Sequence, residues 1–186
     1  LSDFTKAIEL EGGASSYNSR GLVHDKLGRL DLALEDFTKA VALEAGNGVF
    51  WHNRGYCLRN MGEFSRAVDD YSRAIRCTPA NPTAYNNRGF AWRKLGRFDL
   101  AVADYTKSLE LQPGNVKTLN NRAYSLAKLG QYDRAVADYT EVIKLDTNNS
   151  HAYHNRGISL DKLGLAAEAV ADLTKAVELD PANANA

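Results

Sequence analysis

A set of short motifs that returns every 34 residues is the feature that most constrains the fold of this chain. The tripeptide Asn-Arg-Gly stands at residues 53–55, 87–89 and 155–157, with variants at 19–21 and 121–123. A Leu-Gly or Met-Gly pair follows in every copy, at residues 27–28, 61–62, 95–96, 129–130 and 163–164. A fixed period of this size indicates an array in which each unit packs mainly against its neighbours.

The period divides the chain into full and partial units. The five full units are residues 14–47, 48–81, 82–115, 116–149 and 150–183. Residues 1–13 match the second half of a unit and predict a second helix of a partial repeat, whereas residues 184–186 begin a further repeat. Because neither end carries an extra polar capping helix, we interpret the chain as a fragment of a longer array.

Each unit reads as two helices joined by a tight turn. In residues 82–115, Pro82 suits a first helical turn, and apolar or small residues then recur at helical spacing up to Leu95. Gly96 is expected to end this helix in a left-handed conformation. A second helix follows, with Ala101 and Tyr105 on its buried side. A short turn between two helices requires them to lie antiparallel, so the sequence predicts an all-α array of helix pairs.

This pattern resembles the tetratricopeptide repeat, and the resemblance covers the whole chain. The family's first-helix aromatic residue is matched by Tyr17, Trp51, Tyr85 and Tyr153. Its helix-crossing glycine is matched by Gly21, Gly55, Gly89 and Gly157, and its second-helix alanine by Ala33, Ala67, Ala101, Ala135 and Ala169. The resemblance implies a right-handed superhelical α-solenoid whose first helices line a concave groove. It also implies a non-catalytic scaffold that binds a segment of another protein.

The composition argues against several classes of partner. Lys plus Arg and Asp plus Glu both number 23, so no net field favours nucleic acid or an anionic membrane. No apolar run reaches the length of a membrane span, and residues 1–10 read as part of a repeat rather than a signal peptide. Two cysteines are too few for a disulfide framework. We therefore expect an intracellular, cytoplasmic protein, with cytoskeletal or ciliary association as an alternative.

One departure from the family pattern recurs in every unit. An arginine precedes the crossing position of the first helix, and an aspartate lies on the second helix. We expect ion pairs between them, at Arg20 and Asp36, Arg54 and Asp70, Arg88 and Asp104, Arg122 and Asp138, and Arg156 and Asp172. The alternative is that the arginines bind an anionic ligand.

A ladder of asparagines is the first feature of the predicted groove. It consists of one residue in each of four units, Asn53, Asn87, Asn121 and Asn155. An amide can both donate to and accept from a peptide group, whatever side chain that peptide carries. The ladder is similar to one in a glycosyltransferase of this family, where such residues hold an extended peptide. The alternative is that these amides pack between neighbouring first helices.

An aromatic and basic row is the second feature of the groove. Its members are Tyr56, Phe90 and Tyr124, with Arg59, Arg93, Lys94 and Lys128 beside them. The same face carries four further candidate binding residues, His52, Asn86, Lys117 and Asn120. Aromatic and cationic side chains suit a partner segment with acidic and apolar residues. Alternatively, the aromatic rings pack between units.

No catalytic, cofactor or metal motif is evident, so we expect no enzyme activity and no cofactor. His151 and His154 lie one helical turn apart, but no third ligand is near them in sequence.

Only Asn87 and Lys117 fit the clamp with which chaperone-tail binders of this family hold a carboxylate. Two alternative functions are single-stranded RNA binding, which the neutral charge opposes, and an architectural or self-associating module in a large assembly.

Overall fold

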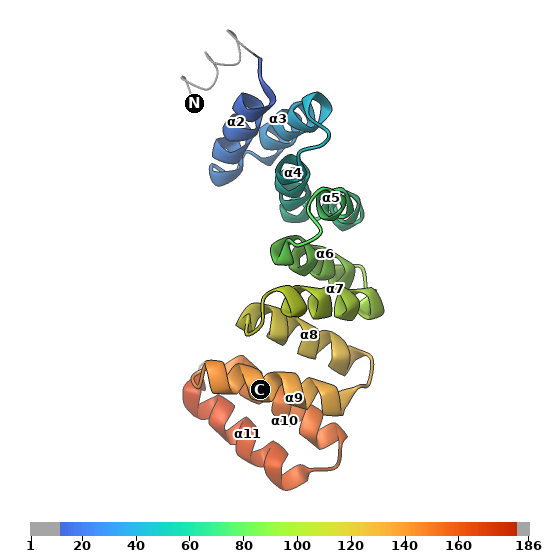
Figure 1. Cartoon of the computed structure of the whole chain (residues 1–186). Helices are drawn as coiled ribbons and strands as arrows, with labels where there is room; N and C mark the ends of the chain where they lie inside the picture. Colours follow the sequence, from blue (N-terminus) through green and yellow to red (C-terminus); the bar gives the residue numbers. More distant parts are fainter. Residues whose placement is uncertain (1–11, 182–186) are drawn as a thin grey trace. The chain divides into compact units, whose positions relative to one another are not determined.

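A computed structural model describes residues 12–181, and its regular secondary structure over that range is helical (Figure 1). The α-helices are α2 (Ala14–Lys26), α3 (Leu30–Leu43), α4 (Gly48–Asn60), α5 (Phe64–Cys77), α6 (Pro82–Lys94), α7 (Phe98–Leu111), α8 (Val116–Lys128), α9 (Tyr132–Leu145), α10 (Ser150–Lys162) and α11 (Ala166–Leu179). The predicted second helix within 1–13 and the start of a repeat at 184–186 lie outside the described residues.

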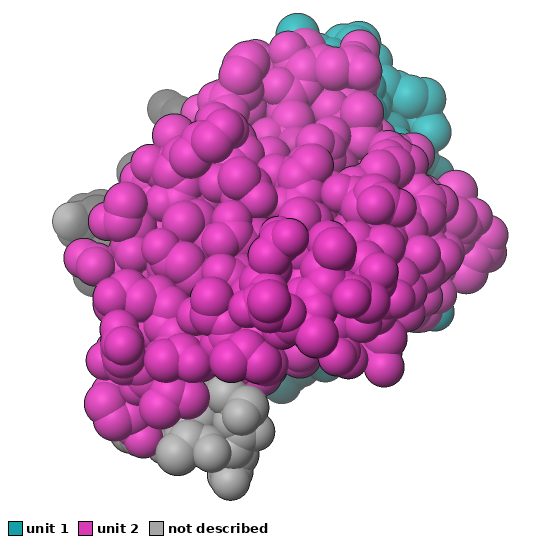
Figure 2. Space-filling model, turned by 90° about the horizontal axis from the view of Figure 1, so that it is seen from below, with its two compact units in different colours: residues 1–95 teal, residues 96–186 magenta. Residues whose placement is uncertain are grey.

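The helices form two compact units, residues 1–95 and residues 96–186, which are coloured separately in Figure 2. The first unit contains α2 to α6 and the second contains α7 to α11. Within each unit, a first helix contacts the second helix of its own repeat and the second helix of the repeat before it. Consecutive first helices also touch, at α2–α4, α4–α6 and α8–α10. The expected all-α array of antiparallel helix pairs is confirmed.

Asparagine and glycine define where the helices begin and end. The side-chain oxygens of Asn47, Asn81, Asn115 and Asn149 accept hydrogen bonds from backbone N–H groups in the first turns of α4, α6, α8 and α10. Such capping satisfies donors that have no partner within the helix. The turn glycine after each first helix has a positive φ of 70–82°, a conformation in which a side chain would be strained.

Aromatic rings and small residues together form the core of each helix pair. Phe37, Tyr71 and Tyr139 are almost completely buried, and an alanine such as Ala67 is buried beside each ring. Gly55 lies where α4 crosses α5, because a Cβ at this position would be 3.1 Å from Cε1 of Tyr71 and 3.2 Å from Cβ of Asp70. The small residues therefore set the distance between the paired helices.

No helix within residues 12–181 is long and apolar enough to cross a lipid bilayer.

The contact at Gly55 predicts a steric effect on stability. Gly55→Leu should lower the free energy of unfolding by about 1–3 kcal/mol, because the added side chain has to displace the ring of Tyr71. Urea unfolding followed by circular dichroism measures the change. Gly46→Leu is the matched control, since no atom lies within 4 Å of a Cβ there. Equal midpoints for the two variants would contradict the close approach.

Candidate functional site

The recurring arginines and aspartates form bidentate ion pairs within each unit. Nε and Nη2 of the arginine donate to the two carboxylate oxygens over 2.6–2.8 Å, at Arg20–Asp36, Arg54–Asp70, Arg122–Asp138 and Arg156–Asp172. The aspartates are buried, whereas about a fifth of each arginine side chain is exposed. These hydrogen bonds raise the pKa of Arg20 and of Arg156. Arg88 lies in the first unit and Asp104 in the second, so that pair stays a prediction.

Some of these arginines also reach the preceding repeat. Nη1 donates to a hydroxyl on the previous second helix, from Arg88 to Ser72 over 3.0 Å and from Arg156 to Thr140 over 3.0 Å. Arg122 makes the same contact with Thr106 over 3.2 Å. The guanidinium groups of Arg122 and Arg156 thus each contact two second helices while they extend from a first helix. Since three nitrogens of each group already donate to the protein, the geometry favours the structural interpretation over binding of an anionic ligand.

In the first unit, the asparagine ladder takes part in contacts between first helices. The amide of Asn53 on α4 donates to Oδ1 of Asn18 on α2 over 2.9 Å. Asn87 on α6 is buried, and its Oδ1 accepts from Nη1 of Arg59 over 3.2 Å. Its amide nitrogen lies 3.4 Å from Nε2 of His52. These two asparagines therefore connect neighbouring repeats, as the alternative interpretation of the ladder supposed.

The aromatic row of the first unit surrounds Arg59. The guanidinium lies 4.2 Å from the ring centre of Tyr56 and 5.2 Å from that of Phe90. Phe90 also packs edge-on against Phe64, with 6.5 Å between ring centres. A cation against the faces of two rings is an attractive arrangement. The space between Tyr56 and Phe90 is consequently occupied by a side chain of the protein itself.

His52 is held in its neutral form by these surroundings. Burial, and then the positive charge of Arg59, lowers the pKa of His52. Its ring packs edge-on against Tyr71 at 5.5 Å, and its Nδ1 has no hydrogen-bond partner among the described residues. Because the side-chain oxygen of Asn87 accepts from Arg59, the side-chain NH2 group of Asn87 faces His52. A neutral ring can accept there, whereas a charged ring would add a proton facing that donor.

The second unit leaves a pocket at the corresponding face. A cavity of about 350 Å³ lies between α8 and α10 and is lined by Tyr124, Ala127, Asn155 and Ile158, with Lys128 and Lys162 also in its wall. Tyr132 and Tyr139 of α9 and Ser159 complete the lining. The side chain of Asn155 makes no hydrogen bond to another described residue. Three predicted groove residues, Tyr124, Lys128 and Asn155, are therefore brought together here.

The remaining candidates are spread over the first-helix faces. Arg93 and Lys94 lie over the ring of Phe90 at 4.9 Å and 5.6 Å. Lys117 is exposed, whereas Asn86, Asn120 and Asn121 are partly buried. None of these six residues contributes to the pocket lining.

Sequence reasoning did not identify Ala127 or Tyr132 as lining residues. Tyr132 has counterparts at the start of the two preceding second helices, Phe64 and Phe98, so its 34-residue period was an available signal. Phe98 packs edge-on against Tyr124, as Phe64 does against Phe90. Ala127 gave no signal of its own, since its effect lies in the volume that it leaves open.

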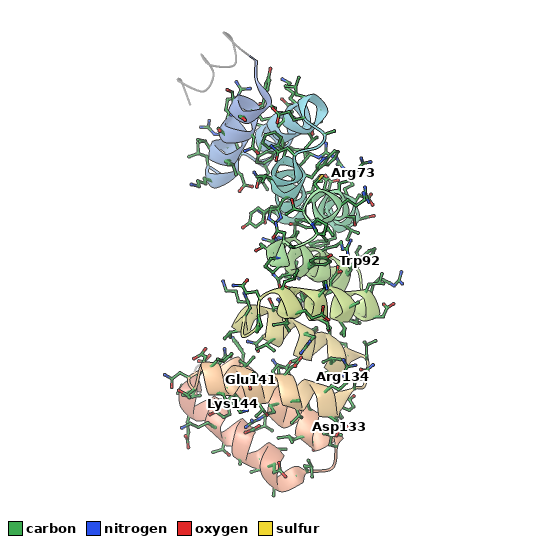
Figure 3. The ribbon with its side chains drawn as sticks, viewed as in Figure 1. Arg73, Trp92, Asp133, Arg134, Glu141 and Lys144 are labelled. Atoms are coloured by element: carbon green, nitrogen blue, oxygen red, sulfur yellow. The ribbon has the colours of Figure 1, made fainter. Side chains whose placement is uncertain are left out.

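Other surface pairs lie away from the pocket. Figure 3 labels Glu141 and Lys144 on α9, which form an exposed ion pair with an N···O distance of 3.2 Å. It also labels Arg73, whose guanidinium lies 4.7 Å from the ring centre of Trp51. Arg54 lies over the same indole at 4.8 Å. The exposed pair of Glu141 and Lys144 contributes little to stability, and none of these residues lines the pocket.

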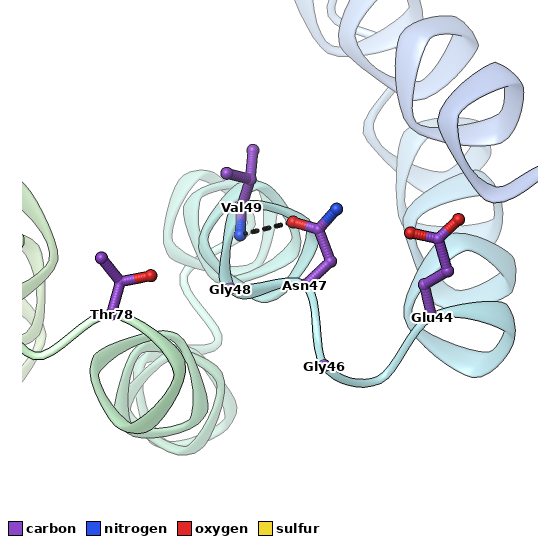
Figure 4. A pocket seen from close by; sticks show the side chains of 6 residues that line it. All are labelled: Glu44, Gly46, Asn47, Gly48, Val49 and Thr78. Atoms are coloured by element: carbon purple, nitrogen blue, oxygen red, sulfur yellow. Dashed lines mark hydrogen bonds between the residues drawn. The ribbon is translucent and has the colours of Figure 1, made fainter.

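A more open pocket of about 570 Å³ lies beside the loop that precedes α4 (Figure 4). Asn47, Val49 and Thr78 contribute to its lining, and Oδ1 of Asn47 accepts from the backbone N–H of Val49 over 3.1 Å. A Cβ at Gly48 would lie 2.9 Å from Cβ of Cys77. The shape of this pocket therefore follows from helix capping and from the close packing of α4 on α5.

Within residues 12–181, no group of three or more His, Cys, Asp and Glu residues is placed to hold a metal ion. Cys57 and Cys77 are free thiols. Cys57 is buried, donates to the carbonyl of Leu30 over 3.4 Å, and has its pKa raised to about 11, first of all by burial. A thiol that stays protonated is a poor nucleophile, so Cys57 acts as a small core residue.

Comparison with known protein families gives matches along most of the chain. Models described as tetratricopeptide repeat match residues 14–47, 82–115, 116–149 and 150–183. A further model, described as TPR repeat, matches residues 55–96. No curated protein sequence matches the chain significantly.

Solved structures of similar fold cover nearly the whole chain. One is YrrB, described as a TPR protein with an unusual peptide-binding site, with a TM-score of 0.88 and 23% identity over 96% of this chain and 92% of YrrB. MamA matches with a TM-score of 0.86 and 19% identity over 92% of this chain and 94% of MamA. MamA 41-end from Desulfovibrio magneticus RS-1 matches with a TM-score of 0.86 and 17% identity over 91% of this chain and 96% of its own.

Breaking one ion pair should destabilise the array. Arg122→Ala leaves the carboxylate of Asp138 buried without its cation, and we expect the free energy of unfolding to fall by about 3 kcal/mol. Lys144→Ala, which removes the exposed pair with Glu141, should change it by less than about 0.5 kcal/mol. Urea unfolding of both variants tests this, and similar midpoints would show that the pair at Arg122 contributes no more than a surface pair.

His52 should make stability depend on pH. The unfolded chain takes up a proton near the ordinary histidine pKa of about 6.5, whereas the folded chain resists it because the pKa is lowered. The stability due to neutral His52 is present above about pH 6.5 and is lost as the pH falls from there toward the folded-state pKa. Relative to His52→Gln, the wild-type urea midpoint should decline between about pH 7 and about pH 5. Parallel pH profiles would contradict the buried neutral ring.

Proposed function

Because this chain belongs to the tetratricopeptide repeat family, we propose that it is a non-catalytic scaffold that binds a segment of a partner protein. The segment lies in an extended or helical form against the faces of the first helices. Its main contacts are with α8 and α10, where one polar amide and an apolar cavity adjoin. Peptide recognition needs this combination, since the amide pairs with the backbone and the cavity takes a side chain.

The observation that carries the proposal is the difference between the two first-helix faces. In the first unit, Asn53 donates to Asn18, and Asn87 accepts from Arg59. In the second unit, Asn155 borders an open pocket. A built pocket beside an available amide is where a ligand gains most from binding, because few internal contacts have to be broken first.

The similarity to YrrB supports the same kind of function. YrrB has a peptide-binding site, and the present chain shares its fold. The candidate binding residues differ from one repeat to the next. In the second unit, Lys128 and Lys162 place positive charge at the rim of the pocket. The partner segment that this rim favours carries acidic residues together with apolar ones.

Replacing the amide at the pocket should weaken binding. Peptides selected against the 186-residue chain from a random library serve as ligands, and isothermal titration calorimetry measures their affinity. Asn155→Ala should reduce affinity about fivefold, the contribution of roughly one net hydrogen bond.

Asn148→Ala is the matched control, because Asn148 is an exposed loop residue on the other side of the α10 N-cap. Its affinity should equal that of the wild type. Failure to select any peptide would reject the proposed function, and selected peptides that bind both variants equally would reject the role of Asn155.

A further inference from the structure

Equivalent places in the two units differ in the side chain that fills them. Position 59 carries arginine, whereas position 127, which lies two 34-residue repeats later, carries alanine. The surrounding residues correspond in the same register, with Tyr124 for Tyr56, Asn155 for Asn87 and Ile158 for Phe90. The chain thus contains a closed version and an open version of one site.

The closed version shows what the site accommodates. The guanidinium of Arg59 lies between the rings of Tyr56 and Phe90, at 4.2 Å and 5.2 Å, and donates to Oδ1 of Asn87 over 3.2 Å. A side chain inserted between residues 56 and 90 therefore contacts two flat or apolar surfaces and one amide at the same time.

The open version has walls at the same register but lacks that side chain. Ala127 ends at its Cβ, and a cavity of about 350 Å³ lies beside Tyr124, Asn155 and Ile158. Tyr124 is held in place from behind by Phe98, at 6.4 Å between ring centres. The Tyr124 wall of the cavity is therefore supported before a ligand binds, which reduces the entropy lost in ordering it.

The charges at the rim decide which side chain fits. Lys128 and Lys162 are in the wall, and no carboxylate is among the lining residues. A partner arginine that imitated Arg59 would bring a third cation next to these lysines. An apolar side chain avoids this repulsion and loses its contact with water on Tyr124 and Ile158. A carboxylate next to it along the partner chain would lie near the lysines.

We infer that the pocket at Ala127 is a specificity subsite for one apolar side chain, of the size of leucine, flanked by acidic residues in the partner segment. This inference rests on the proposed function and assigns the chemistry of its central contact. Position 127 acts as the selector, since an arginine there closes the subsite and an alanine opens it.

Designed peptides test the subsite directly. The probe is the acetylated and amidated peptide Gly-Glu-Asp-Leu-Asp-Glu-Gly, titrated to millimolar concentration into the ¹⁵N-labelled chain. The backbone signals of Asn155, Ile158 and Lys162 should shift. A version with alanine in place of leucine should bind about tenfold more weakly, as expected for the loss of one buried apolar side chain. A version with lysine in place of every acidic residue should cause no shift.

Substitution of the selector supplies the matched comparison. Ala127→Arg should abolish the shifts, and the fold should tolerate it because arginine already stands at this register in the second and third repeats, as Arg59 and Arg93. Asn148→Arg, which adds the same charge on an exposed loop outside the pocket lining, should leave them. Circular dichroism checks that both variants stay helical.

The outcomes separate the subsite from the wider function. Unshifted pocket signals with the leucine peptide, or stronger binding of the lysine version, would overturn the subsite. Library-selected peptides whose affinity is unaffected by Ala127→Arg would also overturn it, while leaving the scaffold function intact. A library that yields no binder at all would instead count against the proposed function itself.

Discussion

The array depends on an arginine that is shared among three helices. In the second unit, Arg156 extends from α10, makes two hydrogen bonds to Asp172 on α11 and donates a third to Thr140 on α9. One side chain thus fixes the distance within a helix pair and the distance to the previous pair. Hydrophobic contacts alone would allow neighbouring helices to slide, whereas a planar guanidinium with directed donors defines one register. This constraint recurs in the same geometry at Arg122.

The same arrangement explains why the two faces of a first helix can differ so much. On the side of a first helix that faces the second helices, the arginine forms the ion pair and the glycine allows the close approach. These two residues are nearly invariant along the chain. The opposite side carries no such requirement. Its residues change from repeat to repeat, so that Arg59 fills a space that Ala127 leaves open. Variation on this side alters the binding surface without altering the packing that supports it.

Periodicity made the fold readable from the sequence. Arginine and aspartate recurring together in five units pointed to a contact, and helix ends followed from glycine and proline signals. Periodicity could not show which asparagines of the ladder are already hydrogen-bonded within the protein. Asn87 is occupied because His52 and Arg59 stand beside it, whereas Asn155 has different neighbours. A repeating residue therefore predicts a repeating position, but its availability depends on residues that do not repeat. The capping role of Asn47 and its counterparts was also missed, although that residue ends every unit in the sequence.

The asparagine caps have a consequence for how such a chain can change in length. The side-chain oxygens of Asn81, Asn115 and Asn149 accept hydrogen bonds from backbone N–H groups of the helical turn that follows each of them. A junction placed just before one of these residues would divide the gene between repeats that each begin with their own helix cap. Duplication or deletion of one whole module would then recreate the same boundary chemistry, and the surface pattern would be recombined as blocks. The cap thus gives evolution and protein engineering a natural site for splicing.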